Sequence, residues 1–189
     1  MNIKNISLKS VIAASVVITL FACDGTYREK QKLTLSDFGP IAEGEHINLK
    51  YTDSGKLISN LITPKLLDYS NFDFPFSEYP QGINLVFWDE DGKKSTITSE
   101  YAINYDKAQL VDLRGNVHII TGDSTVLKAT QLYWNQSSQW VFTDQPYQIV
   151  FKDGSFNNGN SFDSNEDFTN FLSRKNVGVQ IVDNTNTDE

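Results

Sequence analysis

The amino-acid sequence predicts an all-β protein built from antiparallel hairpins that stack in layers, as in a solenoid or an elongated roll. Short segments with alternating apolar and polar residues are each followed by a turn rich in Asp, Gly or Ser, as in hairpins with one buried face. These segments recur every thirty-odd residues along a chain of 189. Such recurrence is typical of stacked units. The 39% of hydrophobic residues is enough to bury a sizeable core.

The repeat comprises four segments, at residues 47–51, 83–87, 117–121 and 147–151. Aligning them on Ile47, Ile83, Val117 and Ile149 gives spacings of 36, 34 and 32 residues. Turn signals follow at residues 53–55, 89–92, 122–124 and 153–154. A second alternating run comes after the turn, as in residues 57–63 and 95–99, and is predicted to be the return strand of a hairpin.

Alternation also assigns the side chains of these strands to two faces, because successive residues of a strand point to opposite sides. The apolar face is predicted to hold Ile47, Leu49, Tyr51, Ile83, Leu85, Phe87, Val117, Ile119, Tyr147, Ile149 and Phe151. The opposite face is predicted to hold Asn48, Lys50, Asn84, His118, Gln148 and Lys152. The apolar face either packs on itself as a sandwich core or lines a groove that admits lipid, and hydrophobicity alone does not separate the two.

The N-terminus has the features of a targeting segment. Lys4 and Lys9 precede an uncharged, mostly apolar run at residues 11–22, and Cys23, the single cysteine, follows it. Twelve residues make a helix of about 18 Å, short of the ~30 Å hydrocarbon core of a bilayer. The residues around Cys23 resemble the lipobox of bacterial lipoproteins, although Phe21 replaces the usual small residue. An ordinary secretory signal with a chance cysteine, or a short uncleaved anchor, remains an alternative.

These features predict four parts of the chain: a signal peptide at residues 1–22, a lipidated N-terminus and tether at 23–44, a β-domain at 45–182 and a disordered tail at 183–189. Lipidation at Cys23 would give a stable membrane anchor. Asp24 resembles the signal that keeps many Gram-negative lipoproteins in the inner membrane.

Three further segments depart from the repeat. Residues 64–82 contain three prolines and five aromatic residues, which predicts mainly a loop that closes one mouth of the sheet pair. Residues 164–167 (Ser-Asn-Glu-Asp) have the pattern of a capping box and predict one short helix near the C-terminus. A final strand is expected through Val177, Val179 and Ile181.

Composition argues against several classes of function. The net charge is −8 and there is no basic stripe, so nucleic acid is not an expected partner. One Cys and two His are too few for a structural zinc site. Residues 89–92 (Asp-Glu-Asp-Gly) lack the remaining ligands of a calcium loop and are better explained as a hairpin turn. With no catalytic motif evident, the sequence predicts neither an enzyme nor a metal or cofactor.

Several short blocks, in order, resemble one protein family. In chain order they are Gly-Lys-Leu at residues 55–57, residues 61–64, Leu-Arg-Gly-Asn-Val at 113–117, residues 129–135, and residues 159–168, which begin with Gly-Asn-Ser-Phe. Together they resemble the LptC family of lipopolysaccharide-export proteins. The resemblance implies an open antiparallel β-jellyroll, also called a β-taco, whose two sheets enclose a lipid groove. It further implies a periplasmic protein that takes lipopolysaccharide from an inner-membrane ABC transporter and passes it to the bridge protein LptA. Many family members carry a transmembrane helix where this chain offers a lipid anchor.

Joined to the resemblance, the face assignment predicts the lipid-binding residues. They are Leu49, Leu61, Leu85, Phe87, Ile97, Val117, Ile119, Leu132, Ile149 and Phe151. Open sheet edges invite strand addition by partners. The edge near Ile47, Leu49 and Tyr51 is expected to face the transporter, and the edge near Val177, Val179 and Ile181 to receive an LptA-like protein. The alternative is a β-rich structural or polysaccharide-binding lipoprotein that displays Trp88, Trp134 and Trp140 as a stacking platform.

Overall fold

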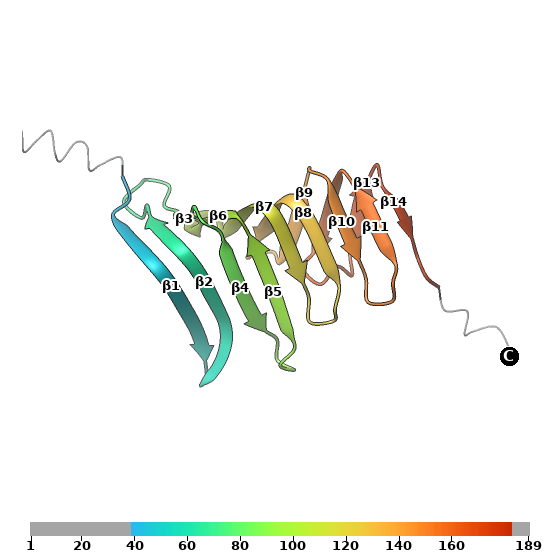
Figure 1. The fold of residues 1–189 in the computed structure, drawn as a ribbon, viewed down its shortest axis with the longest axis horizontal. Helices are drawn as coiled ribbons and strands as arrows, with labels where there is room; N and C mark the ends of the chain where they lie inside the picture. The colour runs from blue at the N-terminus through green and yellow to red at the C-terminus, as the bar shows by residue number, and fades with distance from the viewer. Residues whose placement is uncertain (1–38, 183–189) are drawn as a thin grey trace, which may run out of the picture. The chain divides into compact units, whose positions relative to one another are not determined.

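A computed structural model describes residues 39–182, and the fold in this range is all-β as predicted (Figure 1). Fourteen strands form one continuous sheet in which every pairing is antiparallel. The described residues contain a single 3₁₀ turn, Asp106–Ala108, and no α-helix. The predicted signal peptide, Cys23, Asp24 and the tail at 183–189 lie outside the described range.

The strands follow one another in short hairpins. Their bounds are β1 (Ala42–Asp53), β2 (Lys56–Asp68), β3 (Ser77–Tyr79), β4 (Ile83–Trp88), β5 (Lys94–Ser99), β6 (Tyr101–Tyr105), β7 (Leu110–Ile120), β8 (Val126–Asn135), β9 (Trp140–Thr143), β10 (Tyr147–Val150), β11 (Phe156–Gly159), β12 (Ser161–Asn165), β13 (Phe171–Arg174) and β14 (Val177–Val179). The first strand thus begins three residues before the expected domain start at residue 45.

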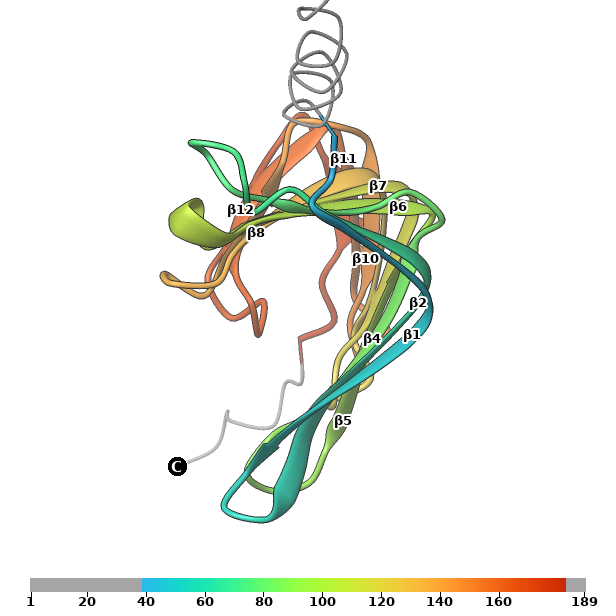
Figure 2. The same cartoon turned by 90° about the vertical axis from the view of Figure 1, so that its left-hand side faces the viewer.

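The continuous sheet is bent into two layers. Sheet I contains β1, β2, β4, β5, the second half of β7, the first half of β8, β10, β11 and β14. Sheet II contains the end of β2, then β3, β6, the first half of β7, the second half of β8, β9, β12 and β13. The long strands β7 and β8 therefore belong to both layers, and the end-on view in Figure 2 shows the layers diverging from this bend.

The bend in β7 falls in the Leu-Arg-Gly-Asn-Val block. Gly115 and Asn116 both have positive φ, +71° and +43°, and the register against β8 shifts between Arg114 and Val117. A Cβ at Gly115 would lie 2.6 Å from the Glu100 carboxylate, and the Gly115 carbonyl accepts a hydrogen bond from the Glu100 N–H at 2.9 Å. Glycine is needed here because it adopts this backbone conformation freely and leaves room for the chain that turns from β5 into β6.

The predicted loop at residues 64–82 is wrong in part, because β2 continues through Pro64 to Asp68 and β3 follows at Ser77–Tyr79. Strand β2 tolerates Pro64 because no strand is paired with this residue on one of its two sides. On that side β4 pairs with β2 only as far as Ile62, and β3 pairs with it only from Leu67, whereas β1 lies along the other side. The missing N–H thus falls where β2 changes partners. Residues 69–76 do form a loop.

The predicted short helix near the C-terminus is also wrong. Ser161–Asn165 is strand β12, held between β9 and β13, and residues 166–170 form the turn that follows it. A helix of one turn forms few backbone hydrogen bonds relative to the number of residues whose conformation it fixes. A strand between two other strands forms backbone hydrogen bonds along both of its edges, and the segment therefore adopts the strand. The final strand agrees with the prediction at Val177 and Val179, but Ile181 lies beyond it and donates its N–H to Ser155 Oγ at 2.9 Å.

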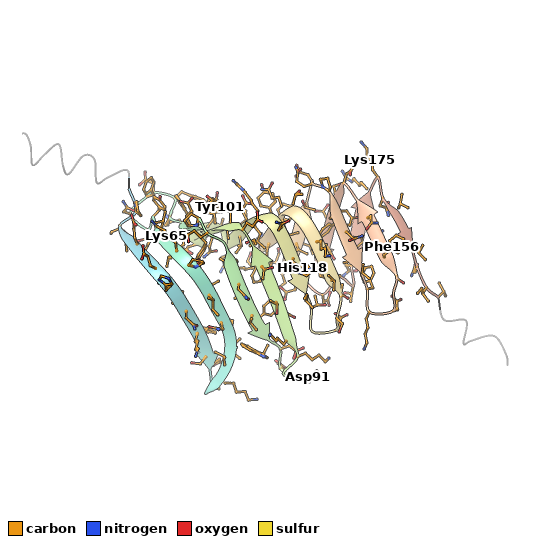
Figure 3. All side chains as sticks on the ribbon, viewed as in Figure 1. Lys65, Asp91, Tyr101, His118, Phe156 and Lys175 are labelled. Atoms are coloured by element: carbon orange, nitrogen blue, oxygen red, sulfur yellow. The ribbon has the colours of Figure 1, made fainter. Side chains whose placement is uncertain are left out.

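The core lies between the two sheets. Its most fully buried apolar side chains come from both layers and are Leu113, Val117, Leu127, Leu132, Ile149 and Phe162. Rings from opposite layers meet directly, as for Tyr147 of β10 and Phe162 of β12, whose centroids are 4.7 Å apart. The side chains that alternate with these core residues along sheet I face the other way, and Figure 3 shows one of them, His118, on this outer surface.

Candidate functional site: an apolar slot between the sheets

The inner face of sheet I carries one continuous row of aliphatic side chains. The register pairs each member directly with the next, in the order Leu49, Leu61, Leu85, Ile97, Ile119, Leu127 and Ile149. Residues directly opposite each other in antiparallel strands point to the same face, so the row runs across seven strands. Six members are among the ten predicted lipid-binding residues. Leu127 was not predicted, although its alternation with Ala129 after the turn at 122–124 marks it as inward-facing.

Burial increases along this row from the N-terminal to the C-terminal strands. Leu49 on edge strand β1 is 51% exposed, Ile97 and Ile119 are each 5% exposed, and Leu127 and Ile149 are fully buried. Leu61 and Leu85 lie between these extremes. The hairpin ends of β1, β2, β4 and β5 reach beyond the second layer (Figure 2). The inner face is therefore open at its N-terminal end and packed at its C-terminal end.

A cavity of about 310 Å³ lies between the layers in the middle of the row, and we call it the central cavity. Four of the predicted residues line it: Phe87, Ile97, Ile119 and Leu132. Leu113, Trp134, Val141 and Phe168 complete its apolar wall. Its volume is at the lower end of the ~300–1,000 Å³ range of small-molecule sites.

The rim of the central cavity is polar and mainly acidic. It includes Asp89, Asp123, Glu166 and Asp167, with Lys93 as the cation. Figure 3 shows Asp91 at the tip of the neighbouring β4–β5 hairpin, where its carboxylate lies 3.7 Å from the Lys93 ammonium. The site thus combines an apolar interior with a negatively charged entrance.

Asp123 is fixed in its charged form at this rim. Burial alone would raise the pKa of its carboxyl, but hydrogen bonds from the Thr121 hydroxyl and from the N–H and hydroxyl of Thr125 outweigh burial and lower the pKa. The carboxylate therefore shapes the β7–β8 turn and stays ionised at neutral pH.

The remaining predicted residues lie toward the C-terminal end. Val117 and Ile149 are closely packed in the core, with exposures of 1% and 0%. Phe151 is half-buried and borders a second cavity of about 560 Å³, which we call the mouth cavity. Phe171, Asn157 and Gln180 also border it.

The sheet ends in free edges, as predicted. Within residues 39–182, strand β1 pairs only with β2, and along β1 Ile47 is half-buried while Leu49 and Tyr51 are exposed. Among the strands that the structure describes, β14 pairs only with β11, and Val177, Val179 and Ile181 at this end are all exposed. Both ends thus offer backbone groups and apolar side chains to a further strand.

Comparison with models of protein families identifies the family of this chain. A model described as "Lipopolysaccharide-assembly, LptC-related" matches residues 11–167, which is most of the chain. The chain belongs to the LptC-related family. No curated protein matches it closely enough to count as a relative.

Membership of the LptC-related family assigns the chain a role on the periplasmic side of lipopolysaccharide transport, and the family is one of transport proteins. The matched range includes the bend at Gly115 and the whole N-terminal part of the aliphatic row. Among residues 39–182, no helix is long and apolar enough to cross a membrane.

The three tryptophans of this LptC-related chain do not share a surface. Trp134 faces the central cavity and stacks on Phe87, with ring centroids 6.4 Å apart and planes at 18°. Trp88 follows Phe87 on β4 and so faces outward from sheet I, whereas Trp140 pairs with Asn135 on the outer side of sheet II. The stacking platform expected of a polysaccharide-binding protein is therefore not assembled.

Proposed function

We propose that this chain accepts lipopolysaccharide from an inner-membrane ABC transporter in the slot between its sheets and passes it to an LptA-like bridge protein. The observation that supports this most directly is the aliphatic row running across sheet I to the central cavity. The proposed activity is transport without catalysis, with no metal or cofactor.

Affinity in this proposal comes from the acyl chains. A net charge of −8 and an acidic rim repel the phosphorylated sugar of the ligand, so the head group is best placed outside the slot. Each buried CH₂ contributes about 0.8 kcal/mol, and several chains together outweigh the cost of association. Because the central cavity is small, the two layers must part to accept more than a single chain.

The free edges supply the route between proteins in this proposal. A strand from the transporter adds to β1 near Ile47, Leu49 and Tyr51, and a strand from the LptA-like protein adds near Val177, Val179 and Ile181. Strand addition of this kind joins the slot of one protein to the next through main-chain hydrogen bonds.

Anchoring is the last part of the proposal. Residues 1–22 act as a signal peptide, Cys23 becomes lipid-modified, and Asp24 retains the protein at the inner membrane with the residues between Cys23 and β1 as a tether. Labelling of cells with radioactive palmitate tests this assignment. The wild-type chain should take up label and a Cys23→Ala variant should not, and equal labelling would contradict it.

Photo-crosslinking in cells tests lipid binding itself. A photoreactive amino acid at Leu85 or Ile119, on the inner face, should capture lipopolysaccharide because acyl chains lie against this face. The matched controls are Asn84, next to Leu85 on β4, and Lys50, next to Leu49 on β1, because both face outward. Equal capture from the two faces would rule out the slot as the binding site.

A further inference from the structure

Between the central cavity and the mouth cavity stands a wall of aromatic rings. Phe162 and Phe171 of sheet II stack with centroids 5.3 Å apart. Phe171 reaches across to sheet I, where it meets Tyr147 at 6.0 Å and Phe151 at 6.3 Å. Phe171 and Phe151 border the mouth cavity, and Phe168, whose ring lies against that of Phe162, borders the central cavity. These rings therefore fill the slot from one cavity to the other and divide it into two compartments, with Phe168 on the side of the central cavity.

The turn at residues 166–170 lies at this wall, since Thr169 borders both cavities. Phe168, in the middle of the turn, has only 5% of its surface exposed, although its neighbours Asp167 and Thr169 are exposed. Its ring borders the central cavity, and its centroid is 6.5 Å from that of Phe162. A polar turn thus inserts a single aromatic ring into the slot.

The backbone of Phe168 is held in an uncommon conformation, with φ at +58°. A bulky residue rarely adopts positive φ and keeps it only where the surroundings impose it. Here the turn is closed by hydrogen bonds to Asn165, whose carbonyl accepts from the Phe168 N–H at 3.1 Å and whose side-chain oxygen accepts from the Asn170 N–H at 2.7 Å. The turn that places the Phe168 ring in the slot therefore contains a strained backbone conformation.

The turn is bonded to only one of the two layers. Its hydrogen bonds stay within the β12–β13 hairpin or reach Gln139 of sheet II, whose carbonyl accepts from the Glu166 N–H at 3.0 Å and whose amide donates to the Glu166 carboxylate at 3.0 Å. Within residues 39–182, none of them joins the turn to sheet I. Movement of the turn away from sheet I would therefore break apolar contacts but none of these hydrogen bonds.

We propose that Phe168 is a gate between the two compartments of the slot: its ring holds an acyl chain in the central cavity and withdraws with the turn when the chain moves toward the C-terminal edge. This inference rests on the proposed function, because it assumes that acyl chains enter the slot. It adds the residue that controls their passage, which lies just beyond the part of the chain matched by the family model.

Two photo-crosslinking positions in the full-length chain read out the gate. Ile119 reports lipopolysaccharide in the central cavity, and Gln180 reports it at the mouth cavity, where an exposed side chain tolerates replacement. The measured quantity is the ratio of capture at Gln180 to capture at Ile119. Phe168→Ala should raise this ratio severalfold because the ring that closes the central cavity and packs on Phe162 is lost, and Phe168→Trp should lower it because the ring is larger.

Leu172→Ala is the matched control, since Leu172 belongs to the same hairpin but is exposed. It should leave the ratio unchanged. An equal ratio in the wild type and both Phe168 variants, with capture at Ile119 intact, would overturn the gate alone. Loss of all capture at Ile119 in the wild type would instead overturn the proposed function. Because the ratio is internal and the two Phe168 variants act in opposite directions, partial loss of folded protein does not imitate the expected result.

Discussion

At the scale of single residues, the face of the sheet decides what a side chain does. Ile119 lines the central cavity, whereas His118, its neighbour on β7, points outward. Asp112 shows that the outer face has buried positions as well. It is 1% exposed, and its carboxylate accepts hydrogen bonds from Arg114 and Gln131, which compensate for its burial.

A charge placed inside the slot should block transport. In Phe87→Arg, an unpaired guanidinium replaces a ring that borders the central cavity and stacks on Trp134. Transfer of lipopolysaccharide to an LptA-like acceptor should fall by about tenfold or more, equivalent to about 1.4 kcal/mol. Purified donor and acceptor, with ligand on each followed over time, provide the measurement. Asn84→Arg adds the same charge on the outer face of β4 and should transfer normally, and normal transfer by a folded Phe87→Arg protein would refute the expectation.

At the scale of elements, the sequence correctly predicted features that depend on local residue pattern, such as the direction of side chains along a strand. It did not predict features that depend on which strands lie next to a segment. Period-2 alternation correctly placed Leu85 and Ile97 in one row, because side-chain direction follows from backbone geometry. The helix expected to begin at the capping box of residues 164–167 does not form, because Ser164 pairs with both β9 and β13, and a local capping pattern contains no information about such partners. For the same reason alternation identified an inner face but not the cavity in front of it, which depends on what the opposite sheet contributes.

The C-terminal edge offers a test of strand addition. A Cβ at Gly178 would lie 2.5 Å from the backbone oxygen of Phe156, so Gly178→Val should push β14 away from β11. Because β14 is exposed, the free energy of unfolding should fall by only about 1 kcal/mol. Binding of the LptA-like protein should weaken by about tenfold or more, since its docking strand is displaced. Calorimetric titration measures the affinity, with Val182→Ala as an exposed control just beyond the edge. Unchanged affinity would show that the partner binds elsewhere.

At the scale of the whole molecule, the proposed function sets charge and hydrophobicity against each other in ligand binding. The chain carries 24 acidic against 16 basic residues, and the rim of its central cavity is mainly acidic. In the proposed function, a phosphorylated lipid therefore approaches against electrostatic repulsion and is retained by its acyl chains. This balance differs from that of a protein that captures phosphates with lysine and arginine, for which added salt weakens binding.

The balance predicts the sign of the salt dependence. Raising ionic strength from about 0.01 M to about 0.15 M shortens the Debye length from ~30 Å to ~8 Å. This screens the repulsion between the ligand's phosphates and the rim but leaves the burial of acyl chains intact, so capture of lipopolysaccharide by a photoreactive residue at Ile119 should increase. An uncharged alkyl maltoside, which competes for the same apolar surface, should bind with little change over this range. Capture that decreases with salt would mean that cationic side chains attract the head group, and the acyl-chain slot would then no longer account for the affinity.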